Sequence, residues 1–390
     1  MKQEITCIFS LFNMSWSKKR TNELIQFIYE RNISVNEFFQ IEKMQWEIFQ
    51  KEFEFSLKEI QDLKKAKESL VSNSFLLEKL LSEGVEILPF TSEEYPKSLK
   101  ENLELKNLPT LLFCKGNLEL LKKRCVSIVG SRSAKEISLE FTRKIAQIEA
   151  GNKEVIVSGF AKGVDREAFE ATIEYGGKTI IVLPQGILTF KLPKEYYSYY
   201  TKKQILIMST YPPNSTWNTG YAMERNNYIY ALGSQIYVAE SDSKGGTWNG
   251  VIEGLKKGRK ILVRIPQDNE VNANEMLIAK GAKAIDMDGS LVNDYVIKNK
   301  QIINPMEIEE DIKKILLSSE KPISIEMIFE KIDNNKYNIS LNSIRNVVKK
   351  IENIEFEKRK GRNFYYIGKG LKKEENKKDI LNNGFVGSLF

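Results

Sequence analysis

The chain has 390 residues, of which 42% are hydrophobic and 28% charged, so it can bury large cores and is not expected to be disordered. Its 59 Lys and Arg against 52 Asp and Glu give a net charge of +7, which suits a nucleic-acid partner without requiring one. The absence of histidine excludes Ser-His-Asp triads, Cys-His dyads, HExxH zinc sites and Cys/His zinc fingers.

The cysteines and the hydropathy indicate a cytoplasmic protein. Cys7, Cys114 and Cys125 are odd in number and far from CxxC spacing, which argues against a disulfide framework or a metal site. No apolar run approaches the ~18 residues that a membrane helix needs, so we expect no membrane partner. The apolar run 5–12 follows Glu4 and precedes no small-residue cleavage site, so we expect no signal peptide.

Residues 1–83 are predicted to form a helical domain. Apolar residues such as Leu24, Ile25 and Ile28 recur there at helical spacing. No glycine occurs before Gly84, which fits helices joined by few tight turns.

Residues 84–295 alternate between short apolar runs and amphipathic segments. The predicted strands are Val85–Phe90, Leu111–Cys114, Val126–Val129, Val155–Val157, Thr179–Leu183, Ile205–Met208, Ile236–Ala239 and Lys260–Ile265. Most are β-branched and apolar on both faces, as buried parallel strands are. The alternation predicts an α/β domain with a doubly wound parallel sheet.

After a polar linker at 293–305, residues 306–370 predict three helices and two strands, Ile354–Lys358 and Asn363–Ile367. Three helices followed by a basic hairpin are the outline of a winged helix. Its basic residues are either a second DNA contact or a solvated face. The candidates for that contact are Arg345, Lys349, Arg359, Lys360 and Arg362. The remaining residues, 371–390, read as a polar tail.

Three predicted strands end in glycine-containing turns that precede helices, at 126–132, 157–165 and 239–247. Carboxyl ends of parallel strands meet in one crevice, where helix N-termini and glycine backbone can hold a phosphate. One such turn is usually only a tight turn, but three together, with Arg132 and Lys162 beside two of them, favour an anion site. Neither GxGxxG in the first turn nor GxxxxGK[ST] is present, so an ordinary dinucleotide fingerprint and a P-loop are missing.

Two further polar features accompany these turns. Arg225 and Asn226 begin an otherwise apolar segment and lie either in a solvated first helical turn or aimed at the same crevice. Four tyrosines could stack on bases, although packing against the sheet edge is the more usual fate of such residues. They are Tyr196, Tyr197, Tyr199 and Tyr200.

Four runs carry a resemblance to a known family. They are VSIVGSR (126–132), VSGFAKGVDREAFEATIEYGGKTIIVLPQGI (157–187), MERNNYIYALGSQIYVAE (223–240) and KGGTWNGVIEGLKKGRKILV (244–263). Together they resemble the DNA-processing protein A family (DprA, also called Smf), over roughly residues 84–266. The resemblance implies an extended Rossmann-like domain with a helical domain similar to a sterile alpha motif before it and a winged helix after it.

The family resemblance also implies a function. It implies a single-stranded DNA-binding protein without reaction chemistry, cofactor or metal, which protects incoming DNA and passes it to a RecA-type recombinase during natural transformation (competence). It also implies a homodimer. The residues carried over as phosphate and DNA contacts are Ser131, Arg132, Gly159, Lys162, Gly163, Arg225, Asn226, Gly245, Gly246 and Thr247.

The sequence departs from the family pattern at several motif positions. Asn227 and Tyr228 stand where the family usually has Arg-Ile, so one base is lost, and Phe169 and Trp248 replace a usual His and Leu. These changes indicate a divergent member, for which a mobile-element or antiphage role is an alternative to recombinase loading.

Two other functions remain open from the residues. Pockets of this kind also bind small nucleotides, so a nucleotide-signal sensor is one alternative. The other is a phosphoribohydrolase of the lysine-decarboxylase-like (LOG) group, whose PGGxGTxxE motif is echoed by the Gly-Gly-Thr run at 245–247. However, residue 250, where the motif needs its glutamate, is glycine, and the nearest later carboxylate is Glu253.

Overall fold

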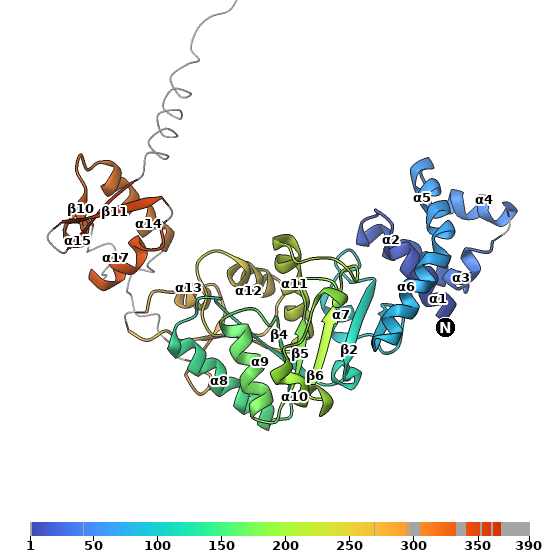
Figure 1. Ribbon diagram of the computed structural model, residues 1–390, viewed down its shortest axis with the longest axis horizontal. Coiled ribbons are helices and arrows are strands. Elements are labelled where there is room, and N and C mark those ends of the chain that lie inside the picture. The colour runs from blue at the N-terminus through green and yellow to red at the C-terminus, as the bar shows by residue number, and fades with distance from the viewer. Residues whose placement is uncertain are drawn as a thin grey trace, which may run out of the picture.

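The computed structural model describes residues 2–41, 43–268, 270–293, 295, 305–332, 341–351, 353–359 and 362–367. Figure 1 shows helices at the N-terminus, a central sheet flanked by helices, and a small C-terminal unit. Lys360 and the predicted tail 371–390 lie outside the described residues. Within them, no helix is both long and apolar enough to cross a membrane.

The N-terminal part is helical, as predicted. Its helices are α1 (Lys2–Phe12), α2 (Lys18–Tyr29), α3 (Val35–Phe38), α4 (Lys43–Glu52), α5 (Leu57–Glu68) and α6 (Leu70–Ser82). Ser34 and Ser56 begin α3 and α5 with capping boxes, in which the serine side chain and a glutamate three residues later satisfy free N–H groups. Phe9 and Phe12 of α1 pack against the ring of Phe113 in the sheet, so helices and sheet share one core.

The central sheet has nine strands. They are β1 (Val85–Pro89), β2 (Leu111–Gly116), β3 (Cys125–Val129), β4 (Val155–Ser158), β5 (Lys178–Val182), β6 (Ile205–Ser209), β7 (Ile236–Val238), β8 (Ile261–Arg264) and β9 (Lys283–Ile285). Their order is β1-β2-β6-β5-β4-β3-β7-β8-β9. From β3 the chain winds first toward β6 and then, from β7, in the opposite direction, which confirms the doubly wound sheet and places its switch point between β3 and β7.

Two features of the sheet differ from a plain parallel arrangement. Strands β3 to β9 pair in parallel, but β2 runs antiparallel to both β1 and β6. Strand β9 was not predicted, because it has three residues and begins with an exposed lysine, too short a run for a pattern to emerge.

Helices cover both faces of the sheet. The helical elements of this part are α7 (Lys97–Asn102), η1 (Leu118–Lys122), α8 (Glu136–Gly151), α9 (Val164–Glu174), η2 (Ile187–Thr189), η3 (Lys194–Tyr196), α10 (Tyr197–Thr201), α11 (Thr219–Leu232), α12 (Gly246–Lys256) and α13 (Asn274–Ala279). Alternate residues of β3 face opposite cores: Ile128 packs in the core that contains Phe141 and Ile145 of α8, and Val129 packs in the core that contains Ile229 of α11. Burial on both faces explains why β3 is apolar except at Ser127, whose hydroxyl donates to the carbonyl of Ile229 over 2.7 Å.

The C-terminal unit has the winged-helix arrangement predicted from its sequence. It comprises α14 (Pro305–Leu317), β10 (Ile323–Ser324), α15 (Ile325–Lys331), α17 (Leu341–Val348), β11 (Ile354–Arg359) and β12 (Arg362–Ile367), with strand order β10-β12-β11. Ile312, Ile328 and Ile344, from three helices, meet Tyr365 in a core that is separate from the core of the sheet. The unit therefore has its own apolar interior.

Candidate functional site

A cavity of about 380 Å³ opens where β3 and β7 end, at the switch point of the sheet. Strands β4, β3 and β7 are neighbours, so the three glycine-containing turns predicted to meet do lie together. Of the candidate residues, the turns after β3 and β7 contribute five to the wall and α11 contributes two. These seven are Ser131, Arg132, Arg225, Asn226, Gly245, Gly246 and Thr247.

Hydrogen bonds join the turn after β3 to the turn after β7. The backbone N–H of Ser131 donates to the carbonyl of Glu240 over 2.9 Å, and the Thr247 hydroxyl donates to the carbonyl of Gly130 over 3.1 Å. A Cβ atom on Gly130 would lie 2.6 Å from a methyl carbon of Val164, closer than side chains approach. Glycine at 130 therefore lets the first turn pack directly on α9.

The N-terminus of α12 contributes to the wall of this cavity and has no acidic residue in its own first turn, although Asp165 and Asp242 line the same cavity. Gly245 precedes the helix with φ of 99°, a conformation that glycine adopts readily. The first N–H groups of a helix have no partner within it and carry partial positive charge. Gly245, Gly246 and Thr247 thus present an end of α12 that suits an anion.

The N-terminus of α8 differs from this expectation. The helix begins at Glu136, four residues after Arg132, and the N–H of Lys135 and the hydroxyl of Ser138 both donate to the carboxylate of Glu240, over 3.1 and 2.7 Å. Because the Glu240 carboxylate already accepts these hydrogen bonds, the N-terminus of α8 is not open to a ligand. Arg132 lies instead in the exposed loop before the helix.

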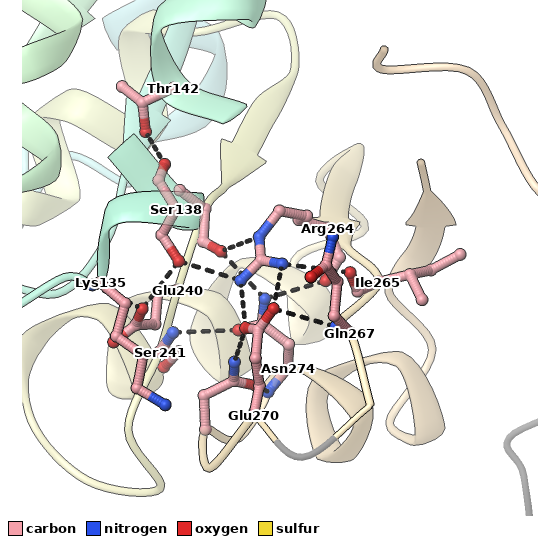
Figure 2. A network of polar contacts seen from close by, with 12 residues as sticks. Lys135, Ser138, Thr142, Glu240, Ser241, Arg264, Ile265, Gln267, Glu270 and Asn274 are labelled. Carbon is pink, nitrogen blue, oxygen red and sulfur yellow. Dashed lines mark hydrogen bonds and ion pairs between the residues drawn. The ribbon is translucent and has the colours of Figure 1, made fainter. Parts of the chain in front are cut away.

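Figure 2 shows that Glu240 belongs to a network of polar contacts, in which Ser138, Glu240, Arg264 and Asn274 are buried. Arg264, fully buried on β8, donates from Nη2 to the Ser138 hydroxyl over 2.9 Å and forms a two-pronged ion pair with Glu270, over 2.9 and 2.6 Å. Its Nε donates to the carbonyl of Ala239 at the end of β7 over 3.0 Å. The network ties β7, β8 and the start of α8 together behind the turns.

The ion pair with Arg264 lowers the pKa of Glu270. Burial by itself raises the pKa of the Glu270 carboxyl, but hydrogen bonds from Arg264 and from the backbone of Gln267, together with the Arg264 charge, outweigh it. The pKa of Glu270 therefore lies below its ordinary value, and this carboxylate is charged at neutral pH.

The structure buries Arg225, which the sequence predicted as a DNA contact at the crevice. Its side chain is 2% exposed, with Nη1 at 3.2 Å from the carbonyl of Val182 and 3.6 Å from a carboxylate oxygen of Asp165. Burial lowers the pKa of Arg225 and raises that of Asp165, although the two charges partly offset this effect. Arg225 lines the cavity from within the fold, and its Nε is buried without a hydrogen-bond partner.

A second hollow of about 290 Å³ adjoins the first cavity. It is lined by Gly159 and Lys162, and it shares Arg132 and Arg225 with the larger cavity. Aromatic side chains contribute to its wall, namely Phe160, Phe190 and Trp217. Nine of the ten candidate residues thus line two adjoining hollows, and their contact with DNA stays a prediction.

Gly163, the tenth candidate, lines neither hollow. It caps α9 with φ of 83°, and a side chain there would collide with the backbone carbonyl of Ser131. Glycine is therefore needed at position 163 because the turns after β3 and β4 approach each other closely there.

Sequence reasoning missed several residues of the site. Asp165, Trp217 and Lys244 line the larger cavity, and Glu240 and Arg264 hold its turns from behind. A signal existed for Arg264, since an arginine inside an otherwise apolar strand needs a buried partner. For Trp217 and Lys244 no local pattern predicts that they face the cavity.

The other candidate residues lie away from the cavity. Tyr196 packs on Phe169 with ring centroids 4.9 Å apart, as the packing interpretation expects, whereas Tyr197 is 53% exposed. In the winged helix, Lys349 and Arg359 are exposed, and Arg359 pairs with Glu357. The remaining two candidates there are Arg345, which is partly exposed on α17, and Arg362, which begins β12.

Comparison with known proteins adds sequence and structural relatives. The sequence model described as DNA recombination-mediator protein A matches residues 86–295, and a Ribonuclease R winged-helix domain model matches 310–373. The DNA processing protein DprA of Streptococcus pneumoniae is 34% identical over 206 residues, which are 52% of this chain and 71% of that protein. DprA of Bacillus subtilis is 28% identical over 229 residues, 57% of this chain and 75% of that protein.

The fold is similar to a solved structure as well. The X-ray structure of DNA processing protein A from Streptococcus pneumoniae superposes with a TM-score of 0.54 at 26% sequence identity. The superposition covers 73% of this chain and 94% of the other.

Proposed function

This chain belongs to the DNA recombination-mediator protein A family, whose model matches more than half of its length, and we propose that its switch-point cavity binds the phosphate backbone of single-stranded DNA. The observation that carries the proposal is the pairing of an open helix N-terminus at Gly245 with the exposed basic side chains of Arg132 and Lys244 on the same cavity, and of Lys162 on the adjoining hollow. Within the described residues, Arg132, Lys162 and Lys244 have no carboxylate within ion-pair distance. Their charge is therefore available to a phosphate.

The shape of the site favours one strand over two. A hollow of about 380 Å³ has the size of a small-ligand pocket and cannot admit a duplex. Trp217, 49% exposed at the wall between the two hollows, offers an aromatic face on which an unpaired base can stack. Backbone N–H groups and cations read phosphates, which carry no sequence information, so we expect little base preference.

We further propose that the protein protects single-stranded DNA and passes it to a RecA-type recombinase during DNA uptake, and that it acts as a homodimer. Membership of a family described as recombination mediators supports this role. The proposed role is binding and transfer, with no chemical step.

The cavity has no glutamate at the position that the hydrolase alternative requires. The position that would carry the catalytic glutamate is Gly250, and a side chain there would lie 2.8 Å from the ring of Tyr230. Glu253, the nearest later carboxylate, does not line the main cavity and pairs with Lys257 at the surface. We therefore propose no N-glycosidic hydrolysis.

A single titration tests the proposal against a nucleotide sensor. Fluorescence anisotropy with a labelled single-stranded oligonucleotide, competed by unlabelled single strand, duplex and a panel of free nucleotides, measures which ligand holds the site. We expect the unlabelled single strand to compete best. If one free nucleotide displaces the labelled strand at a far lower concentration than the unlabelled oligonucleotide does, the cavity is a nucleotide-sensing site and the DNA-binding proposal is wrong.

A further inference from the structure

The edge of the sheet opposite the cavity concentrates the positive charge of the protein. We call it the amino edge, because the parallel strands begin there. It consists of the segments that lead into six strands, at 118–124, 150–154, 174–178, 199–204, 256–260 and 280–283. These segments hold thirteen Lys and Arg against three Glu, a net charge of +10, so the rest of the chain carries −3.

Most of this charge is exposed and has no acidic partner. All of the thirteen side chains except Arg259 are exposed. Three of them pair with carboxylates: Lys122 with Glu119, Arg124 with Glu154 and Lys257 with Glu253. Nine lysines remain without a carboxylate in ion-pair distance among the described residues. The third glutamate of these segments, Glu174, already pairs with Arg143.

The strand order turns these residues into a continuous row. In the order β6-β5-β4-β3-β7-β8-β9, every strand except β7 begins with or is preceded by at least one of the basic residues. The gap at β7 is bridged by Arg124, whose Nε lies 3.2 Å from the hydroxyl of Ser234, just before that strand. Seven strands at about 4.8 Å spacing make a row roughly 29 Å long, the length of eight or nine stacked nucleotides.

Exposed tyrosines stand at one end of the row. Tyr175 closes α9 just before β5 and is 45% exposed, and Tyr197 begins α10 just before β6 and is 53% exposed. Figure 1 shows α10 beside β6 at the lower side of the sheet. Basic side chains interleaved with exposed aromatic rings are the composition of a surface that tracks a single strand and stacks its bases.

We propose that the amino edge is a second binding surface for single-stranded DNA, separate from the switch-point cavity. Its lysines contact successive phosphates, and Tyr175 and Tyr197 stack on unpaired bases. A row of flexible point charges carries no base-reading geometry, so binding there depends on strand length and salt and hardly on sequence. The inference rests on the proposed function only in its ligand, because no residue of the cavity takes part.

The test is a neutralised edge with a matched control. In the edge variant, Lys123, Lys178, Lys202 and Lys260, which precede or begin β3, β5, β6 and β8, are all changed to Gln. The control variant carries the same charge change on the exposed face of α5, where Lys58, Lys64, Lys65 and Lys67 become Gln. Binding affinity is measured by fluorescence anisotropy across a salt series with three ligands. They are an oligo-dT long enough to occupy both the cavity and the amino edge, a short oligo-dT that fills only the cavity, and a duplex.

The expected result is specific to the long single strand. The edge variant should lose roughly tenfold or more in affinity for it, and the slope of log affinity on log salt should fall by up to about 3, at ~0.7 for each lost contact. Binding of the short oligonucleotide should be unchanged, and the control should match the wild type. The Tyr175→Ala/Tyr197→Ala variant should weaken binding of the long strand with no change in salt slope.

Two outcomes would overturn the inference without touching the cavity. If the edge variant and the α5 control bind the long strand alike while the short one still binds, the amino edge is only a solvated surface. If the edge variant loses duplex binding as strongly as single-strand binding, the edge reads duplex DNA. Failure of the wild type to bind even the short oligonucleotide would instead refute the proposed function.

Discussion

Gly159 and Arg225 share one small volume: a Cβ atom added to Gly159 would occupy almost the position of Nη1 of Arg225. The same atom would lie 2.5 Å from a carboxylate oxygen of Asp165. The glycine at the end of β4 is therefore what lets a buried guanidinium from α11 reach its carboxylate across the sheet.

Gly159→Ala should therefore displace Arg225 and destabilise the fold. Forcing a methyl group into a filled interior costs about 1–3 kcal/mol. Urea unfolding measures the loss, and anisotropy should show weaker single-strand binding. Gly151→Ala, at the open end of α8 with no atom within 4 Å of the added Cβ, is the control and should be neutral or stabilising by up to about 1 kcal/mol. Equal loss in both variants would contradict the steric argument.

Arg225→Ala should lower stability as well as binding. It leaves Asp165 buried without its cation, and breaking a buried pair by removing one partner costs about 3–5 kcal/mol. Adding Asp165→Asn to Arg225→Ala should recover part of that loss, because the isolated charge is removed. The measurement is the midpoint of urea unfolding for wild type, single and double variants. A midpoint unchanged in Arg225→Ala would show that the pair adds nothing to the fold.

Arg132→Ala should weaken DNA binding and leave stability alone, because this side chain is exposed and unpaired with any described carboxylate. A charge-assisted hydrogen bond contributes roughly 1.5–3 kcal/mol, so affinity should fall about tenfold to a hundredfold. The salt slope should fall by ~0.7. Arg124→Ala, at the other end of the same strand, should leave binding of a short oligonucleotide unchanged. Unaltered affinity and slope in Arg132→Ala would remove this residue from the site.

The Arg264–Glu270 pair should make stability fall in acid. The pKa of Glu270 is lower in the fold than in the unfolded chain, so the pair stabilises fully above the unfolded value, ~4.3, and this contribution is lost as pH falls through the folded pKa. Glu270→Ala should cost about 3–5 kcal/mol at neutral pH and reduce the acid dependence. Glu253→Ala, which removes an exposed pair, should stay within about 0.5 kcal/mol. Urea unfolding at neutral and acid pH measures both; an unchanged acid dependence in Glu270→Ala would contradict the assignment.

Removing the winged helix should spare single-strand binding, whereas removing the N-terminal helices should not. The winged helix has a core of its own, so a fragment of residues 1–304 should fold and bind the oligonucleotide. A fragment of residues 84–304 lacks Phe9 and Phe12, whose rings pack against Phe113 in the full chain. One side of the shared core is therefore exposed to solvent in this fragment. Circular dichroism and anisotropy on both fragments check this. A stable, binding 84–304 fragment would mean that the shared core is dispensable.

Much of the fold could be predicted because its signals are local. The strands β3 to β8 are short apolar runs flanked by helical patterns, and each was placed within two residues of its observed ends. Burial on both faces leaves no polar alternation to confuse such a run with a surface strand. The antiparallel direction of β2 has no comparable signal, because pairing partners are chosen across the sheet and not along the chain.

The sequence by itself determined that three glycine-containing turns gather at the switch point, since strand ends, glycines and helix starts all follow from local patterns. It could not tell an exposed arginine from a buried one. Arg132 and Arg225 both stand in polar surroundings in the sequence, but only the packing of α11 against β4 and β5 buries the second beside Asp165. Likewise, the lysines of the amino edge are scattered in sequence between Lys122 and Lys283, and only the parallel pairing of the strands brings them into one row.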